Sequence, residues 1–262
     1  MPVNDSFARR IRLQHLYRRD STGLVIVPLD HPVSVGPAAH SGRLDRLIGE
    51  IADNGADAVV LHKGSVRQVR PRWFRSMSLV VHLSASTGLA GDPDAKYLVC
   101  GVEEALRLGA HGVSVHVNVG SATEARQIAD LAAVADACER WGVPLLAMVY
   151  ARGPAVVDGR APDVVAHAVT VAAELGADLV KTALPDSAAE VAAIVGTCPV
   201  PVVAAGGGSA DPEDTFRHLL TAVHGGAGGV AAGRLVFTAD DPGARVRRLA
   251  ALVSDRTAAV AR

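Results

Sequence analysis

The stretch AAELGADLVKTAL, residues 172–184, contains the end of a predicted helix and the whole of the predicted strand that follows it. Apolar residues at helical spacing lead up to Gly176, and a nearly continuous apolar run begins at Asp178. RLGAH, residues 107–111, repeats this turn just before another apolar run. A helix that ends at glycine and leads straight into a strand buried on both faces is typical of parallel α/β folds.

Apolar runs of this kind recur along the chain, each rich in β-branched residues and closed by glycine, proline or polar residues. The predicted strands are residues 24–31, 57–63, 79–86, 112–120, 144–150, 178–184, 201–207 and 229–237. With helical segments between them, they form a βα unit of about thirty residues, which predicts a (β/α)8 TIM barrel. An open doubly wound sheet is the competing architecture, but the even length of the units favours closure. We therefore expect an α/β protein whose residues 1–262 form a single barrel domain.

The predicted helices include an N-terminal one over residues 5–20, ahead of the first strand. The clearest covers residues 121–142, where Ser121 and Glu124 have the spacing of a capping box and Gly142 ends the helix. The other clear helices are residues 94–109, 162–176 and 211–226.

Composition restricts the classes of partner. Hydrophobic residues make up 49% of the chain and aromatic residues only 3%, so the core is built from Val, Ile, Leu and Ala. The formal net charge of -1 gives no field that would attract nucleic acid or an anionic membrane. Cys100, Cys138 and Cys198 have no CxxC spacing, which indicates a reducing compartment. We expect a cytoplasmic protein with small-molecule partners and no membrane-spanning segment.

Reactive side chains collect at the predicted strand ends, which is where TIM barrels carry their active sites. In chain order these residues are Asp30, His31, His62, Lys63, His82, His116, Tyr150, Arg152, Lys181 and Thr182. This concentration predicts an enzyme.

The lysines are few: Lys63, Lys96 and Lys181. Lys181 lies inside an apolar run, where it could extend to the barrel end or pair with a carboxylate such as Asp30. Alternatively, a confined apolar setting disfavours the ammonium and leaves a free amine that can form a Schiff base with a carbonyl. Lys63 has a similar claim, but the strand that carries Lys181 adjoins the one that carries Tyr150. This comparison favours Lys181 as the nucleophile.

Asp30 and Tyr150 on their own would be members of a buried polar network. Beside an amine nucleophile, they are better suited to proton transfer. His62, His82 and His116 suggest a catalytic zinc, which would make the protein a metal-dependent aldolase or hydrolase. Because HxxxH and HExxH spacings are lacking, we favour core histidines and expect neither a metal nor a cofactor.

Two glycine-containing segments, AAGGGSADPED (204–214) and AAGRLVF (231–237), follow or end the seventh and eighth predicted strands. Glycines allow backbone N–H groups to approach a phosphate, and these loops are the usual phosphate site in TIM barrels. A run of glycines alone is more often just a turn, but its position here favours a phosphate site. Its predicted members are Gly206, Gly207, Gly233 and Arg234.

The segments VPLDHPVS, VVLHKG, VSVHVNVGS, PLLAMVYARG, ELGADLVKT, PVVAAGG and GRLVF, in this order, resemble those of archaeal-type class I fructose-bisphosphate aldolases. They are more similar still to 2-amino-3,7-dideoxy-D-threo-hept-6-ulosonate synthases. The similarity runs from about residue 10 to the end of the chain. It also extends to the related aldolases of aminohydroxybenzoate biosynthesis, which use dihydroxyacetone phosphate and aspartate semialdehyde.

The resemblance implies a Schiff base on Lys181, with Asp30 as general base and Tyr150 as proton donor. It also implies large homo-oligomers, often decamers. The further residues that it places around the phosphosugar are His31, Ser34, Arg152, Thr182, Gly206, Gly207, Gly233 and Arg234.

Three positions separate this chain from parts of the family. Met148 stands where the fructose-bisphosphate enzymes have tryptophan, which favours the heptulosonate branch. The family's usual DHG is DHP in this chain, so Pro32 is expected to reshape the loop beside Asp30. Its usual GRN is GRL, so Leu235 removes a polar group near Arg234.

The resemblance thus implies a class I aldolase that joins a phosphorylated ketone to L-aspartate semialdehyde, giving a seven-carbon amino keto acid. The donor is dihydroxyacetone phosphate or a deoxyketohexose phosphate. Abundant alanine and arginine with few lysines hint at a GC-rich genome, which favours the dihydroxyacetone phosphate version of actinomycete secondary metabolism. Fructose-bisphosphate cleavage and a non-catalytic phosphosugar-binding barrel are the alternatives.

Overall fold

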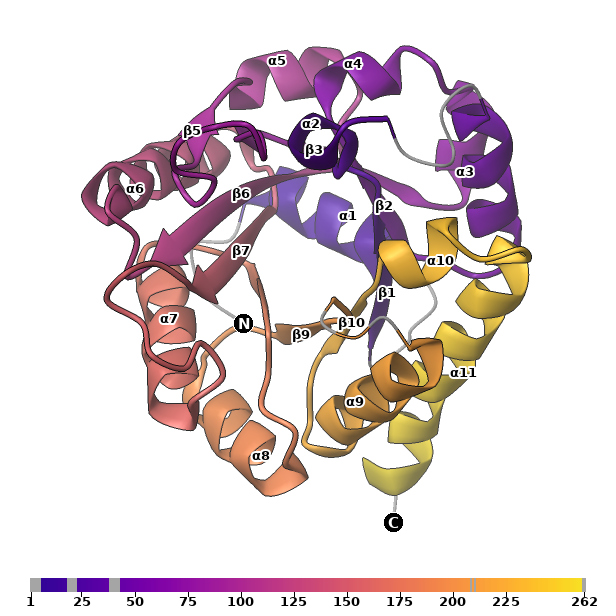
Figure 1. Ribbon diagram of the computed structural model, residues 1–262. Helices are drawn as coiled ribbons and strands as arrows, with labels where there is room; N and C mark the ends of the chain where they lie inside the picture. The colour runs from indigo at the N-terminus through magenta and orange to yellow at the C-terminus, as the bar shows by residue number, and fades with distance from the viewer. Residues whose placement is uncertain (1–5, 18–22, 38–42, 208, 210, 261–262) are drawn as a thin grey trace.

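The computed structural model describes residues 6–17, 23–37, 43–207, 209 and 211–260. Its centre is a closed barrel of parallel strands in the order β1-β10-β9-β8-β7-β6-β3-β2, surrounded by helices (Figure 1). The barrel strands are β1 (Leu24–Pro28), β2 (Ala58–Leu61), β3 (Ser78–His82), β6 (Gly112–Val119), β7 (Leu145–Ala151), β8 (Leu179–Thr182), β9 (Val202–Ala205) and β10 (Gly229–Ala231). The predicted (β/α)8 barrel in a single domain is confirmed.

The helices alternate with these strands. They are α1 (Phe7–Leu16), α2 (Pro32–Val35), α3 (Leu44–Asp53), α4 (Lys63–Val66), the 3-10 turn η1 (Pro71–Arg75), α5 (Val102–Arg107), α6 (Glu124–Trp141), α7 (Pro162–Glu174), α8 (Ala188–Thr197), α9 (Pro212–His224), α10 (Arg234–Phe237) and α11 (Pro242–Val260). None of the helices in this described part of the chain is long and apolar enough to cross a membrane.

Two predicted strands depart most from the structure, and most of the others extend a few residues beyond the observed strand ends. Residues 234–237 of the predicted strand 229–237 form α10, because a short apolar run fits a helix as well as a strand. Residues 79–86 are divided between β3 and a short strand, β4 (Ser84–Ala85), which pairs antiparallel with β5 (Tyr97–Leu98) outside the barrel.

The predicted N-terminal helix 5–20 is α1, Phe7–Leu16, and residues 5 and 18–20 of the prediction lie outside the described residues. Two further predicted helices start at other positions than expected. Only Val102–Arg107 of the predicted helix 94–109 is helical, since part of its N-terminal half forms β5. The predicted helix 121–142 begins at Glu124 rather than after a Ser121 cap. Glu124 Oε2 instead accepts a hydrogen bond of 2.6 Å from the backbone N–H of Gly120, while Gly142 ends the helix in the left-handed conformation as predicted.

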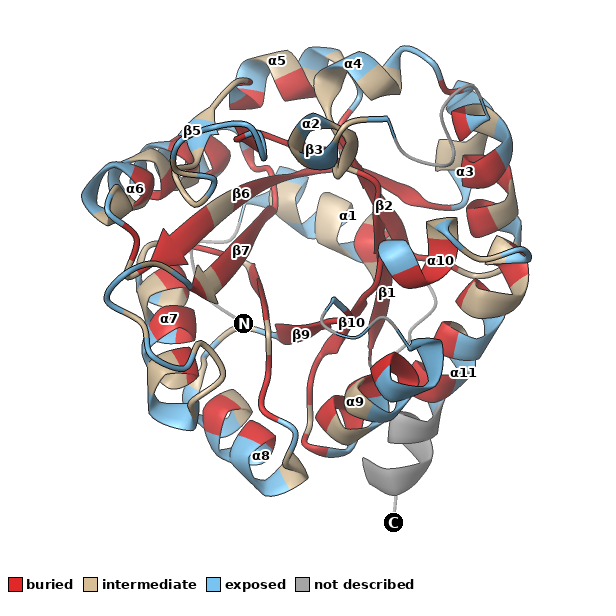
Figure 2. Cartoon of the chain, in the orientation of Figure 1, coloured by how far each residue is buried: buried red, intermediate tan, exposed pale blue. Residues whose placement is uncertain are grey.

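The core has two layers. The larger one lies between the strands and the surrounding helices, whose outer faces are exposed (Figure 2). The smaller one fills the barrel interior with alternate strand residues such as Ile26, Val60, Val80 and Met148. Because this interior layer is packed, the barrel contains no channel along its axis, and its two ends are separate environments.

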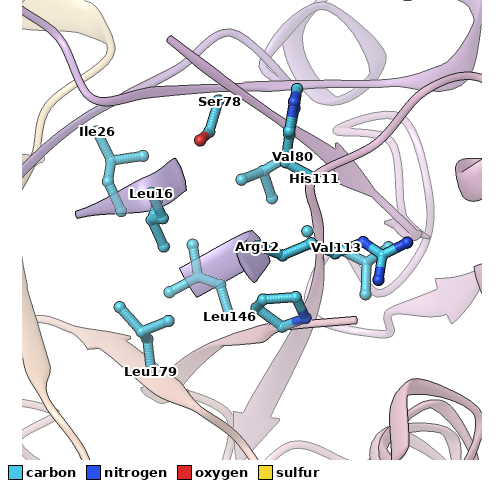
Figure 3. Close-up of a pocket in the computed structure, with 11 residues that line it drawn as sticks. Arg12, Leu16, Ile26, Ser78, Val80, His111, Val113, Leu146 and Leu179 are labelled. Atoms are coloured by element: carbon cyan, nitrogen blue, oxygen red, sulfur yellow. The ribbon is translucent and has the colours of Figure 1, made fainter. Parts of the chain in front are cut away.

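Helix α1 covers the N-terminal ends of the strands. Leu16 packs against the interior layer, and Arg12 Nη1 donates to the carbonyl of Gly142 at 2.9 Å. The side chains around Leu16 leave a cavity of only about 10 Å³ (Figure 3). This end of the barrel is therefore closed, and the opposite end holds the candidate site.

Candidate active site

A cavity of about 510 Å³ opens at the C-terminal ends of the strands. This volume lies within the range of about 300–1,000 Å³ that is usual for small-molecule sites. The predicted site residues that line it are Asp30, His31, Ser34, Tyr150, Arg152, Lys181, Gly206, Gly207, Gly233 and Arg234. The fold therefore brings into one cavity side chains that are spread over most of the sequence.

Lys181 projects into the cavity from β8. Its strand neighbours in register are Met148 on β7 and Val203 on β9, and the residue is only 8% exposed. The Nζ lies 3.9 Å from the Sδ of Met148. A buried amine on a rigid strand, at the edge of a cavity, is well placed to attack a carbonyl group that enters from solvent.

Asp30, which follows β1, provides a carboxylate in the same cavity. Burial alone would raise its pKa, but the charges of His82, Lys181 and two further histidines outweigh burial and lower the pKa to about 2. Asp30 Oδ1 lies 3.5 Å from His31 Nδ1, and Oδ2 lies 3.8 Å from His82 Nε2. At neutral pH the site therefore contains an ionised carboxylate close to the lysine.

Two histidines near Asp30, His62 and His82, have lowered pKa values. Burial lowers the pKa of His82 to about 4, although the charge of Asp30 acts in the opposite direction. The pKa of His62 is also lowered, chiefly by burial, and its ring meets that of His82 edge to face at 5.2 Å. His82 Nδ1 lies 2.8 Å from Ser114 Oγ, which fixes the ring and leaves Nε2 facing Asp30.

Tyr150 lies on the inward face of β7, two residues beyond Met148. Its ring is 5.1 Å from that of His116, and the Arg152 guanidinium lies over it at 4.7 Å from the ring centre. His116 Nε2 donates to Asn118 Oδ1 at 2.9 Å, and burial holds the pKa of His116 well below its ordinary value. These contacts fix the phenol at the cavity wall beside the lysine strand.

Two glycines of the predicted phosphate site lie so close to neighbouring segments of the chain that a side chain would not fit. A Cβ on Gly233 would lie 2.3 Å from the carbonyl oxygen of Pro28, and one on Gly206 would lie 2.9 Å from Ala232 Cβ. Arg234 is exposed, and its Nη2 lies beside Gly207. At the C-terminal ends of β9 and β10, backbone without side chains thus lies beside one guanidinium. Such a combination suits the binding of an anion.

Thr182 is placed apart from the other predicted site residues. It is buried, and since side chains alternate along a strand, it points away from the cavity that Lys181 enters. Lys63, the competing nucleophile, lies outside the cavity, where its Nζ pairs with Glu104 Oε2 at 3.2 Å. Pro32 occupies the first position of α2, where proline is well tolerated, and Leu235 is packed in the outer core.

Lys96 was not predicted as a site residue, although it lines the cavity. It lies in the loop between β4 and β5 with Ser86 and Asp94, which also line the cavity. The one sequence signal was the scarcity of lysine, which applied to Lys96 as much as to Lys63 and Lys181. Among the described residues, no group of three or more His, Cys, Asp or Glu side chains could hold a metal ion, so the histidine-zinc alternative finds no ligand set there.

Comparison with known proteins gives relatives over most of the chain. A 2-amino-4,5-dihydroxy-6-oxo-7-(phosphonooxy)heptanoate synthase from Streptomyces griseus is 56% identical over 254 residues, which cover 97% of this chain and 93% of that protein. A 2-amino-3,7-dideoxy-D-threo-hept-6-ulosonate synthase 1 from Archaeoglobus fulgidus is 40% identical over 234 residues, covering 89% of this chain and 86% of that protein. The solved structure of a Schiff-base-forming fructose-1,6-bisphosphate aldolase has a TM-score of 0.85 and 28% identity, covering 94% of this chain and 99% of that one.

The family of DeoC/LacD aldolases matches residues 24–239, from the first barrel strand to just beyond α10. This match contains every residue that lines the cavity. The barrel, its amine-bearing cavity and these similarities lead to one conclusion: the chain belongs to the DeoC/LacD family of aldolases.

Proposed function

We propose that the protein is a class I aldolase that joins a phosphorylated ketone donor to L-aspartate semialdehyde through a Schiff base on Lys181. The observation that carries the proposal is the position of this amine, which is buried on a barrel strand at a cavity that also holds the ionised carboxylate of Asp30. Lys96, the other lysine at this cavity, lies in a loop and contacts Ser86 Oγ and the Pro93 carbonyl.

The reaction follows from the chemistry of a lysine imine. The Lys181 amine adds to the donor ketone, and loss of water gives a protonated imine that withdraws electrons from the neighbouring carbon. Removal of a proton from that carbon gives an enamine, which attacks the acceptor aldehyde and forms the new carbon–carbon bond. Water then hydrolyses the imine, which releases the product and restores the amine.

Asp30 and Tyr150 are the proposed proton carriers. Asp30 is the base that takes the donor proton and the counter-charge that stabilises the protonated imine, since its carboxylate stays ionised. Tyr150, on the strand next to that of Lys181, is the acid that protonates the new alkoxide. His82 Nε2 lies 3.8 Å from Asp30 Oδ2 and is a further polar neighbour of this carboxylate.

The products of the two relatives suggest the substrates. A 2-amino-4,5-dihydroxy-6-oxo-7-(phosphonooxy)heptanoate divides at its C4–C5 bond into dihydroxyacetone phosphate and L-aspartate semialdehyde. A 3,7-dideoxy product has no phosphate at C7, so it requires a donor such as a deoxyketohexose phosphate. The identity of 56% to the Streptomyces protein, against 40% to the archaeal one, favours dihydroxyacetone phosphate.

The donor phosphate is assigned to the ends of β9 and β10, with Gly206, Gly207 and Gly233 supplying open backbone and Arg234 a bidentate cation. A phosphate held there fixes the donor in the cavity that Lys181 enters. Positioning of this kind makes attack on the ketone an effectively intramolecular step.

Borohydride trapping tests the proposed nucleophile. The enzyme is incubated with dihydroxyacetone phosphate, reduced, and analysed by intact and peptide mass spectrometry. We expect one donor-sized adduct on Lys181 in the wild type and in the matched control Lys63→Ala, and none in Lys181→Ala. An adduct on Lys96, or no adduct at all, would contradict the assignment.

Fructose-bisphosphate cleavage is the second candidate, because the fold closely matches that of an aldolase with this substrate. The two functions are separated by measuring kcat/KM for fructose-1,6-bisphosphate cleavage and for condensation of dihydroxyacetone phosphate with L-aspartate semialdehyde. The proposed function requires condensation to be the faster by at least an order of magnitude. A ligand that binds in calorimetry without turnover of any substrate would instead indicate a non-catalytic barrel.

The assembly state stays a prediction. We expect a homo-oligomer, with a decamer as the form that the resemblance implies. Multi-angle light scattering on the purified protein measures its mass directly against the 27.0 kDa of one chain.

A further inference from the structure

Lys96 lies at the cavity and has no role in the reaction described above. It is partly buried in the loop between β4 and β5, and its Nζ contacts Ser86 Oγ and, at 3.0 Å, the carbonyl oxygen of Pro93. Both partners are neutral. Throughout the described ranges, no carboxylate forms an ion pair with this ammonium, although Asp94 acts on it from a greater distance.

The loop that carries Lys96 is held in place by the barrel. The backbone carbonyl of Asp94 accepts hydrogen bonds of 2.9 Å from Asn118 Nδ2 and Gln127 Nε2, and both of these side chains are buried. Ser86 Oγ also donates to the carbonyl of Pro93 at 2.8 Å. Lys96 is therefore preorganised, and a ligand that binds it does not need to order the loop.

The order of strands around the barrel fixes the side of the cavity on which Lys96 lies. Its loop follows β3, and in the closed ring β3 is opposite β9, while β6 is opposite β10. The glycine loops and Arg234 follow β9 and β10, and Lys181 is on β8, between the two sides. A substrate whose phosphate is bound at β9 and β10, and whose ketone is at Lys181, directs its other end toward the side that carries Lys96.

A second cation lies near this side of the cavity. Arg152, at the end of β7, is exposed above the Tyr150 ring and likewise forms no ion pair within the described part of the chain. Burial lowers the pKa of Lys96, the negative charge of Asp94 raises it in part, and the positive charge of Arg152 lowers it again. Two cations that line one cavity, neither of them in an ion pair within the described residues, favour the binding of an anion there.

We propose that Lys96 binds the carboxylate of the acceptor aldehyde. This inference rests on the proposed function, in which the acceptor is an α-amino acid semialdehyde and the donor phosphate already has a site on the opposite side of the barrel. The carboxylate is the anionic group of that acceptor, and it is at the far end of the molecule from the reacting aldehyde. Lys96 would thus select a carboxylated aldehyde and orient it toward the enamine.

Three aldehydes show which group of the acceptor, the amino group or the carboxylate, Lys96 recognises. L-aspartate semialdehyde has both an amino group and a carboxylate, succinic semialdehyde has only the carboxylate, and 3-aminopropanal has only the amino group. Condensation of each with dihydroxyacetone phosphate is measured for the wild type and Lys96→Gln. We expect KM for the two carboxylated aldehydes to rise about 10- to 100-fold in the variant, as loss of one charge-assisted contact predicts. KM for 3-aminopropanal should change less than about 3-fold, since no carboxylate is present.

Two further variants control for a general defect. Lys63→Gln removes the lysine outside the cavity and should leave all three aldehydes unaffected. Lys96→Arg retains the charge and should recover most of the preference for carboxylated aldehydes. The ratio of KM values between carboxylated and uncarboxylated aldehydes is the deciding quantity, because a partly misfolded preparation lowers all rates without changing that ratio.

The result also distinguishes this inference from the proposed function. Borohydride trapping of the donor on Lys181 does not involve the acceptor and should be unchanged in Lys96→Gln. If wild type condenses L-aspartate semialdehyde and the variant keeps the same preference for carboxylated aldehydes, Lys96 has no such role, while the proposed function stands. If wild type traps the donor but condenses none of the carboxylated aldehydes, the proposed acceptor is wrong and this inference is overturned with it.

Discussion

Met148 and Lys181 are register partners on β7 and β8, and the thioether sulfur of Met148 lies 3.9 Å from Lys181 Nζ. Both side chains point into the barrel, so an apolar, polarisable group forms the floor beneath the amine. The methionine contributes no charge and only a weak acceptor. Its effect on the site is thus mainly one of packing.

Replacement of Met148 by alanine should reduce stability more than it changes chemistry. The side chain is 1% exposed within the interior layer, so its truncation should lower the free energy of unfolding by about 2–5 kcal/mol. Met148→Leu, which conserves volume, should cost less than about 1.5 kcal/mol. Urea denaturation followed by circular dichroism measures both values, and equal losses in the two variants would show that packing is not the main contribution.

Replacement of Asp30 by asparagine should remove a charge from the reaction while leaving the fold in place. We expect kcat to fall about 10²- to 10⁴-fold, the usual contribution of a general base. Because its pKa is about 2, Asp30 stays ionised above pH of about 4, and the acid limb of the wild-type pH–rate profile above that pH should reflect another group. A profile for Asp30→Asn with wild-type kcat would exclude Asp30 as the base.

Gly233 should tolerate no side chain. A Cβ there would lie 2.3 Å from the Pro28 carbonyl oxygen and 2.8 Å from His31 Cε1, so Gly233→Ala must displace the backbone between β10 and α10. We expect KM for the phosphorylated donor to rise at least about 10-fold, the equivalent of about 1.4 kcal/mol of lost binding. The control is Gly64→Ala, because a Cβ on Gly64 meets open space, and its donor KM should equal that of the wild type.

His111, at the closed end of the barrel, should make stability depend on pH. Burial, followed by the charges of His15 and Arg12, lowers its pKa to about 4 from 6.5. Between these two pH values the unfolded chain binds a proton that the folded chain does not, so stability falls as the pH falls. The shift of about 2.5 pKa units corresponds to a loss of roughly 3 kcal/mol at most.

His111→Asn isolates this contribution. His111 Nδ1 accepts a hydrogen bond of 3.1 Å from the backbone N–H of Leu79, and the asparagine carbonyl can replace that acceptor without titrating. The variant should lose less stability than the wild type between pH values of about 7 and 4.5, as measured by urea denaturation at each pH. Parallel losses in the two proteins would assign the acid sensitivity to other histidines, such as buried His82.

Much of the barrel could be predicted from sequence, because strands buried on both faces are nearly continuous apolar runs. The errors occurred where local pattern is ambiguous. Residues 234–237 are apolar enough for a strand, but they form a helical turn at the cavity rim. Likewise, Ser121 and Glu124 have capping-box spacing, yet Glu124 binds the backbone of Gly120 and the helix begins at Glu124 itself.

The candidate site could be predicted where it lies on strands and only partly elsewhere. Asp30, Tyr150 and Lys181 meet in one cavity because the ends of parallel strands converge. Because side chains alternate along a strand, Thr182 and Lys181 point in opposite directions. The position of Thr182 outside the cavity could therefore have been predicted from the sequence. Lys96 could not be placed, since its loop reaches the cavity through contacts with Asn118 and other distant residues.

Because α1 closes the N-terminal end of the barrel, substrates reach the amine of Lys181 from the C-terminal end. Substrates therefore enter and products leave at the end where the cavity of about 510 Å³ opens. The enamine must also exist before the acceptor can react. The proposed reaction should therefore show ordered steady-state kinetics, with dihydroxyacetone phosphate as the leading substrate.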